Sequence, residues 1–313
     1  MKILMIKTGA LGDVVRTSFI AKSLKDKYRN QKPEVFWLTS ERAVPLFINN
    51  PYINKVISEK NKMELINGYF DLVINLEESK ELSRFTSSLN SRKIIGAYWK
   101  NNEIFYTPEA KYWFDTSLIS KYGKKGADKL KKKNKKTHRQ IMAEIIGVTD
   151  HKKYEPFLRL TSKQRIIAKN FMRRHNLSST DFIVGINSGS GERWPKDLPI
   201  KTTAKLIEQI YKKFNAKILL FGGSEEITRN MEIIKISRAP IISTGCGNDL
   251  IEFPALVSVC NFFITTDTLG LHVALALKRK TIALIGPTSN KEVDMYNLGK
   301  KIIAKSNCLC CYK

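Results

Sequence analysis

One stretch, Asn261 to Ser289, constrains the fold most strongly because it contains a complete crossover unit. An apolar strand, a short helix and a second apolar strand follow one another at 262–264, 268–277 and 281–285, and Gly286-Pro287 closes the unit. Two parallel strands need such a crossover, since the chain must return to the edge of the sheet where it began. The stretch therefore predicts an α/β fold with a parallel sheet.

The first of these strands is followed by a group of candidate ligand-binding residues: Asp267, Thr268, Gly270, Leu271 and His272. In parallel sheets, ligands bind beyond the carboxyl ends of the strands, where helices begin. The N–H groups at a helix start attract a phosphate. The alternative is structural: a helix cap, a packing glycine and a half-buried histidine.

The start of the chain has the same strand, loop and helix order. The strand Lys2 to Ile6 leads into Lys7-Thr8-Gly9-Ala10-Leu11-Gly12-Asp13, after which apolar residues recur along one helical face. The loop lacks the residues of a Walker motif and of a dinucleotide-binding fingerprint, so neither site is predicted. Asp13 alone would be interpreted as a first-turn acid that is favoured by the helix dipole.

Further strands are expected at 34–39, 71–76, 93–98, 182–187, 217–221, 240–243 and 301–304, and further helices at 42–48, 80–89, 140–146, 162–175, 201–214, 225–236 and 250–259. Residues 100–116 are aromatic and irregular, and no element is predicted there. A chain of 313 residues with 42% apolar content exceeds the size at which one core usually stops growing. We therefore expect two domains, 1–155 and 156–313, joined near Pro156.

The charge predicts an anionic partner. The chain has 54 Lys and Arg against 29 Asp and Glu, a formal net charge of +25. Ten of the nineteen residues from Lys121 to Arg139 are basic, which is either a solvated surface segment or a strip that contacts an anionic membrane. We do not expect nucleic acid as the partner, because no nucleic-acid recognition motif is visible. No apolar run approaches a membrane span or a signal sequence, so we expect a cytoplasmic protein, with a peripheral contact to the inner membrane surface.

Several motifs together resemble glycosyltransferase family 9, the ADP-heptose:lipopolysaccharide heptosyltransferases. Asp267-Thr268-x-Gly270-x-His272, followed by a small-apolar helix, a strand and Gly-Pro-Thr, resembles the family's nucleotide-sugar site. Many members place the glycine directly after the threonine, whereas Leu269 intervenes here. The loop that ends in Gly12-Asp13, the run Arg193-Trp194-Pro195-Lys196 and the strand followed by Gly222-Gly223 and Glu225 or Glu226 also resemble the family.

The resemblance implies a GT-B fold, in which two Rossmann-like domains face each other across a cleft. It implies that Asp13 is the catalytic base and that Lys196 contacts the diphosphate of the donor. The donor side would comprise Ser188, Gly189, Ser190, Lys196, Glu225, Asp267, Thr268, Gly270, Leu271 and His272, with the glutamate on a ribose hydroxyl. Thr8, Gly12, His138 and Arg139 would lie on the acceptor side, although His138 is equally well interpreted as a surface residue.

The implied function is an inverting, metal-independent transfer of a heptose from ADP-heptose to an anionic glycolipid such as the lipopolysaccharide inner core. No cofactor is expected. Cys308, Cys310 and Cys311 are the alternative metal ligands, because a subgroup of the family carries cysteine-bound iron. Family members usually continue into a final helix, so either the sequence is truncated after Lys313 or that helix is absent. Two further hypotheses stay open: a GT-B transferase with another nucleotide sugar or a protein acceptor, and a non-catalytic basic protein that binds membrane or nucleic acid.

Overall fold

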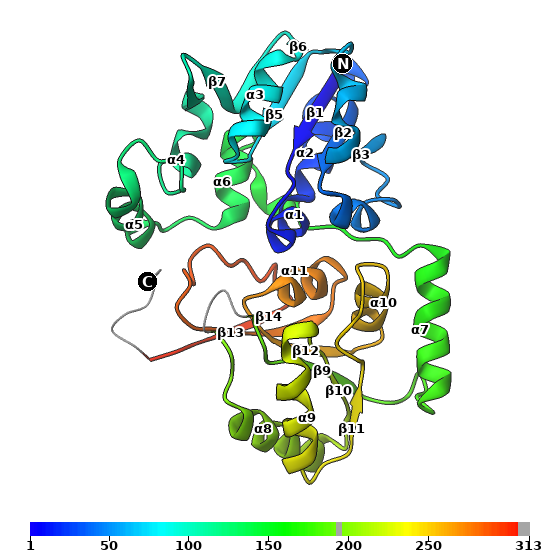
Figure 1. The fold of residues 1–313 in the computed structure, drawn as a ribbon. Coiled ribbons are helices and arrows are strands. Elements are labelled where there is room, and N and C mark those ends of the chain that lie inside the picture. Colours follow the sequence, from blue (N-terminus) through cyan, green and yellow to red (C-terminus); the bar gives the residue numbers. More distant parts are fainter. Residues whose placement is uncertain (192–195, 306–313) are drawn as a thin grey trace. The chain divides into compact units, whose positions relative to one another are not determined.

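The computed structural model describes residues 1–191 and 196–305, and the chain divides into two compact units (Figure 1). Unit 1 comprises Met1–Phe157 together with Lys291–Asp294. Unit 2 comprises Leu158–Asn290 and the chain from Met295 onward. The expected boundary between residues 155 and 156 lies two residues before the point where unit 1 first ends. The return of four later residues to unit 1 was not predicted.

Unit 1 is built on a six-stranded sheet in the order β3-β2-β1-β5-β7-β8. Its strands are β1 (Lys2–Ile6), β2 (Glu34–Thr39), β3 (Lys55–Ser58), β5 (Leu72–Asn75), β7 (Ile94–Lys100) and β8 (Glu103–Tyr106). All neighbours pair in parallel except β7 and β8, which form an antiparallel edge pair. A separate two-stranded sheet joins β4 (Tyr69–Phe70) to β6 (Asn90–Ser91).

Helices cover the sheet of unit 1 because successive strand residues are apolar, so that both faces of the sheet must be buried. On one face Leu4, Ile6 and Val73 pack with Leu82 and Phe85 of α3 (Lys80–Ser88) in a buried cluster. The first helical stretch is divided into α1 (Leu11–Thr17) and α2 (Phe19–Lys27), which meet at Ser18. The remaining helices are α4 (Lys111–Phe114), α5 (Gly123–Lys133) and α6 (His138–Ile145), with 3-10 turns η1 (Arg29–Gln31), η2 (Glu41–Leu46), η3 (Glu59–Leu65), η4 (Pro108–Ala110) and η5 (His151–Lys153).

Unit 2 repeats the same strand pattern in the order β11-β10-β9-β12-β13-β14, and every pair is parallel. Its strands are β9 (Ile183–Asn187), β10 (Lys217–Leu220), β11 (Ile241–Ser243), β12 (Phe262–Thr266), β13 (Lys280–Ile285) and β14 (Gly299–Ile303). In each unit the first three strands of the sheet extend to one side of the first strand, and the later strands extend to the other side. The order therefore reverses between β1 and β5 in unit 1 and between β9 and β12 in unit 2. Ligands of doubly wound sheets bind at such switch points.

The helices of unit 2 are α7 (Ser162–Arg174), α8 (Ile200–Phe214), α9 (Ile227–Ile236), α10 (Glu252–Ser258) and α11 (Leu269–Ala276), with the 3-10 turn η6 (Ser224–Glu226). On one face of the sheet Ile207 of α8 and Ile233 of α9 pack with Val184 and Ile186 of β9. α7 begins with a capping box between Thr161 and Gln164, which satisfies two backbone N–H groups. The predicted α/β fold with parallel sheets is confirmed.

Candidate functional site

Most of the predicted donor-side residues lie near Asn187, at the carboxyl edge of the sheet in unit 2. This asparagine ends β9, and its Nδ2 lies 3.3 Å from Thr265 Oγ1 and 3.2 Å from Thr268 Oγ1. Thr266 Oγ1 donates to the carbonyl oxygen of Gly189 at 2.8 Å, which ties the loop after β9 to the end of β12. The switch point of unit 2 is therefore held together by short polar side chains.

The glycines at 189 and 191 allow the loop after β9 to pass close to Glu226. A Cβ at position 189 would lie 2.3 Å from Cγ of Glu226, too close for any side chain. Gly191 has a φ of +70°, and its N–H donates to Oε1 of Glu226 at 2.7 Å. The other oxygen of Glu226 accepts from the N–H of Gly223 at 2.6 Å. Ser190 is held by Asp197, whose Oδ1 lies 2.5 Å from its Oγ.

Lys196 and Asp267 form the charged centre of this edge. The Nζ of Lys196 donates to the carbonyl oxygen of Asp267 at 3.0 Å and lies 3.6 Å from its Oδ2. Thr288 Oγ1 donates to the same Oδ2 at 2.8 Å, and His272 Nε2 is 3.8 Å from Oδ1. The Lys196 and Asp267 side chains are only 12% and 15% exposed, so their positions are fixed by packing and by polar contacts.

The start of α11 follows directly after this charged centre. Gly270 is its second residue, and a Cβ there would lie 2.8 Å from Nδ2 of Asn187 and 3.3 Å from Oγ1 of Thr265. The glycine is thus required for packing against the switch point, even though Leu269 shifts it by one position. The side chain of Leu271 is fully buried and lies in the core of unit 2. If Leu271 contacts the sugar donor as predicted, it must do so through its backbone.

The two glutamates of the Gly-Gly motif have different surroundings. Glu226 is buried, and both of its oxygens accept backbone N–H groups, so it is a structural residue of the loop. Glu225 is exposed and lies beside Gly191, where an added Cβ would be 2.6 Å from Oε2 of Glu225. Glu225 is therefore the glutamate whose predicted ribose contact is compatible with the local structure.

At the carboxyl edge of unit 1, the loop after β1 surrounds a carboxylate that sequence reasoning missed. Glu77 follows β5, and its Oε1 accepts from Nζ of Lys7 at 2.8 Å and from the N–H groups of Thr8 at 2.7 Å and Gly9 at 3.1 Å. The side chains of Lys7 and Glu77 are 6% and 13% exposed. The signal for this site is the pair of acids, Glu77 and Glu78, directly after an apolar strand. Burial raises the pKa of Glu78 above its ordinary value, although the N–H of Leu118 donates to its carboxylate.

Asp13 lies in the first turn of α1 next to Gly12, as the sequence predicted. Its Oδ1 is 2.7 Å from an Nη of Arg16, three residues later on the same helix. The Asp13 side chain is 29% exposed, whereas that of Arg16 is 12% exposed. The carboxylate is therefore held in one orientation by the guanidinium and remains accessible from solvent.

His138 and Arg139 both lie buried at the start of α6. The interpretation of His138 as a surface residue is wrong, because only 1% of it is exposed and its ring contacts Trp113. An Nη of Arg139 is 2.7 Å from Asp294, and the other donates to the carbonyl oxygens of Lys152 and Tyr154. These contacts explain why residues 291–294 belong to unit 1. The acceptor role of the two residues stays a prediction.

Within residues 1–191 and 196–305, no group of three or more His, Cys, Asp or Glu side chains is arranged to hold a metal ion. Cys308, Cys310 and Cys311 lie outside those residues, as does the run Arg193-Trp194-Pro195. In the same described part of the chain, no helix combines the length and apolar character needed to cross a membrane.

Comparison with known proteins places this geometry in context. The family model of glycosyltransferase family 9 (heptosyltransferase) matches residues 60–313. Lipooligosaccharide heptosyltransferase 2 of Haemophilus influenzae is 24% identical over 92% of this chain and 84% of its own length. A glycosyl transferase family 9 structure from Veillonella parvula has a TM-score of 0.79 at 18% identity, covering 96% of this chain and 86% of its own. The Escherichia coli ADP-heptose lipopolysaccharide heptosyltransferase II has a TM-score of 0.71 at 18% identity, covering 96% and 90%.

Proposed function

The chain belongs to glycosyltransferase family 9, the heptosyltransferases, and on that premise we propose that it transfers a heptose from ADP-heptose to an anionic acceptor such as the lipopolysaccharide inner core. Its two Rossmann-like units have the GT-B fold. Membership of this family makes it a glycosyltransferase and decides against the hypothesis of a non-catalytic basic protein.

One observation carries the proposal: Lys196, Asp267 and the first turn of α11 meet at the switch point of unit 2. The first N–H groups of a helix have no partner within the helix, and the helix dipole favours a negative group there. A lysine beside such a helix start supplies a full positive charge to the same group. A diphosphate is the part of a nucleotide sugar that fits this chemistry, and it is also the leaving group of the transfer.

In the proposed reaction, Asp13 removes the proton from an acceptor hydroxyl as that oxygen attacks the anomeric carbon of the heptose. The bond from the anomeric carbon to the diphosphate oxygen breaks in the same step, and the electron pair leaves with ADP. Attack opposite to the leaving group inverts the anomeric configuration. Lys196 and the α11 N-terminus stabilise the charge that develops on the diphosphate, so the mechanism assigns this task to protein groups and includes no metal.

The donor is tested first by thermal unfolding with ADP, UDP, GDP and CDP, each at saturation. A ligand at about 100 times its Kd stabilises the folded state by about 2.7 kcal/mol, which moves the midpoint by a few degrees in a chain of this size. We expect ADP to give the largest shift. A larger shift with UDP or GDP would favour the transferase hypothesis with another nucleotide sugar.

Two measurements test the stereochemistry and the metal independence. Proton NMR of the first product should show the anomeric configuration opposite to that of ADP-heptose. Retention of configuration would rule out a single displacement with Asp13 as the base. Turnover should be unchanged after treatment with EDTA and with an iron chelator such as 1,10-phenanthroline. A loss that added iron or magnesium restores would assign a role to a metal and direct attention to the C-terminal cysteines.

The basic segment Lys121 to Arg139 supports a contact with the inner membrane surface, where the glycolipid acceptor would be presented. α5 exposes Lys124, Lys125, Lys129, Lys132 and Lys133, and Leu118 just before the helix is 84% exposed. Each basic residue near an anionic bilayer contributes about 1 kcal/mol to binding. Sedimentation with phosphatidylglycerol vesicles should therefore exceed that with phosphatidylcholine vesicles and should fall with salt. Equal sedimentation with both would support a simple solvated helix.

A further inference from the structure

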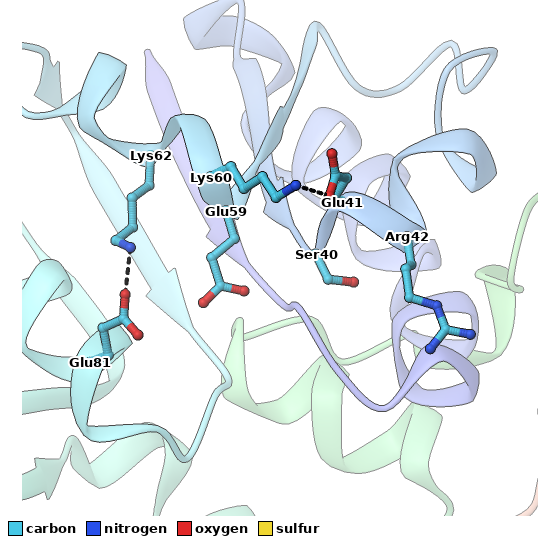
Figure 2. Close-up of a pocket in the computed structure, with 7 residues that line it drawn as sticks. All are labelled: Ser40, Glu41, Arg42, Glu59, Lys60, Lys62 and Glu81. Atoms are coloured by element: carbon cyan, nitrogen blue, oxygen red, sulfur yellow. Dashed lines mark hydrogen bonds and ion pairs between the residues drawn. The ribbon is translucent and has the colours of Figure 1, made fainter.

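A pocket of about 420 Å³ lies in unit 1, and nothing in the proposed mechanism uses it. Two polypeptide segments and one helix form its walls (Figure 2). Ser40, Glu41 and Arg42 follow the carboxyl end of β2, and Glu59, Lys60 and Lys62 follow the carboxyl end of β3. Glu81, in the first turn of α3, completes the lining. The pocket therefore opens at the same edge of the sheet as the start of α1, which carries Asp13.

The charges that line this pocket are balanced, in contrast to the chain as a whole. Three carboxylates face three cations, although the full sequence has a net charge of +25. Lys60 forms an ion pair with Glu41, and Lys62 lies 2.5 Å from Glu81 (Figure 2). These two pairs neutralise four of the six charges. Glu59 and Arg42 are left as the charged groups that can bind a ligand.

Glu59 has no hydrogen bond or ion pair with any residue in the described part of the chain, and Figure 2 shows its carboxylate pointing into the space between the two ion pairs. It is half-buried, and burial, followed by the charge of Glu81, raises its pKa. A carboxylate that loses hydration without gaining a partner destabilises the protein. A half-buried carboxylate without a protein partner is available to accept hydrogen bonds from a ligand.

Three kinds of polar group therefore line the pocket, with Ser40 between Glu59 and Arg42 (Figure 2). Glu59 can accept two hydrogen bonds, and the Arg42 guanidinium can donate several. Ser40 begins η2 but its hydroxyl makes no capping hydrogen bond, so it can do either. Neighbouring hydroxyl groups on a sugar ring both donate and accept, which matches this set. A fully ionised phosphate only accepts hydrogen bonds, so it cannot satisfy the carboxylate of Glu59, whose unpaired charge repels it.

We propose that this pocket binds an uncharged sugar ring of the acceptor and positions it at the sheet edge that carries Asp13. The proposal rests on the proposed function and adds to it that the acceptor, anionic as a whole, presents a neutral sugar next to the reacting hydroxyl. Glu59 and Arg42 are binding residues that select this sugar. The anionic groups of the acceptor would then lie outside the pocket, on the basic surface.

Saturation-transfer NMR with simple glycosides tests this proposal without requiring the natural acceptor. The neutral probes are the methyl pyranosides of mannose, glucose and galactose, and the charged probes are the corresponding sugar 6-phosphates. We expect at least one neutral glycoside to bind the wild type, and its affinity to fall about tenfold in Glu59→Gln and in Arg42→Gln. Glu64→Gln is the matched control, because Glu64 lies on the same 3-10 turn, pairs with Lys55 and does not line the pocket.

Three results would overturn the proposal. One is the absence of saturation transfer from every neutral glycoside with the wild type, and another is unchanged binding in Glu59→Gln. The third is a phosphate preference that strengthens in Glu59→Gln, since removal of a negative charge helps only an anionic ligand. ADP-induced thermal stabilisation of the same samples separates the two proposals. A normal ADP response without glycoside binding contradicts only the pocket, whereas glycoside binding without an ADP response contradicts the proposed donor.

Discussion

The two sheets have the same strand order, but the loops after their first strands hold a glutamate in different ways. In unit 1 the loop after β1 surrounds Glu77 with two N–H groups and with the ammonium group of Lys7. In unit 2 the loop after β9 holds Glu226 through the N–H groups of Gly191 and Gly223. Among the residues that the structure describes, no lysine forms an ion pair with Glu226. Lys196, which follows the same loop, contacts Asp267 near the start of α11 instead.

This difference supports the proposed division of the chemistry between the two units. In unit 1 a carboxylate of the protein itself occupies the place where a parallel sheet would commonly bind a phosphate. The edge of unit 1 is then left with acidic groups such as Asp13 and Glu59, which suit hydroxyl ligands and proton removal. In unit 2 the helix start and Lys196 favour an anion. The following predictions test this division, from the largest expected effect to the smallest.

The substitution Asp13→Asn should abolish measurable sugar transfer, because an amide cannot take the proton of the acceptor hydroxyl. General bases contribute about 10²- to 10⁴-fold to a rate. The Kd for ADP should change less than twofold, since Asp13 belongs to unit 1. Arg16→Gln is the companion variant and should lower kcat less, because it removes only the group that orients the carboxylate. Wild-type turnover in Asp13→Asn would remove this residue from the mechanism.

The substitution Glu77→Gln should destabilise the protein by about 3 to 5 kcal/mol, the usual cost of leaving a buried charge without its partner. The glutamine oxygen can still accept from Thr8 and Gly9, so the variant isolates the loss of charge opposite Lys7. Urea unfolding measures the change. Glu64→Gln breaks an exposed pair with Lys55, 49% and 54% exposed, and should cost at most about 1 kcal/mol. Equal effects would contradict the special role of the loop after β1.

The substitution Lys196→Met should lower kcat about 10²- to 10³-fold, the loss seen when one stabilising group is removed from a developing negative charge. ADP binding should weaken as well, since the ground state already carries the diphosphate. Lys201→Met, on the exposed side of α8, is the control for general loss of positive charge. If both variants behave alike in steady-state kinetics and calorimetry, Lys196 acts only through the net charge.

The smallest effect concerns pH and Glu78. Burial raises the pKa of Glu78 in the folded protein. Between the unfolded and the folded pKa, the folded state therefore binds more protons than the unfolded state. The contribution of Glu78 to stability is greatest below the unfolded pKa and declines as pH rises through the folded one. Glu78→Gln should therefore be more stable than the wild type at neutral pH and should lose this advantage in acid. The opposite pH trend would mean that Leu118 and nearby lysines outweigh burial.

Much of the fold followed from hydrophobic periodicity. The strands at 2–6 and 34–39 were predicted at their observed bounds, and every other predicted strand lies within two residues of an observed one, because parallel strands with two buried faces are continuously apolar. β3, β4, β6 and β8 were missed, since each has only two to four residues. The break between α1 and α2 was also missed, because apolar spacing continues through Ser18.

The candidate site was only partly predictable. Motif resemblance located Asp13, Lys196 and Asp267, but spacing along the chain could not distinguish Glu225 from Glu226. That distinction depends on two backbone N–H groups from different loops. The contacts of Glu77 and the proposed ligand site at Glu59 both depend on strands that are adjacent in space and separated in sequence. The return of residues 291–294 to unit 1 rests on the pairing of Asp294 with Arg139, which no local pattern reveals.

Hydrogen exchange with and without ADP is the most direct test of the division between the two sheet edges. The account predicts that ADP protects the N–H groups of the loop at 188–191 and of the segment 266–272, while exchange in the loop at 7–13 is largely unchanged. The opposite pattern, with protection at 7–13 and none at 188–191 or 266–272, would place the diphosphate on unit 1. That result would contradict the account.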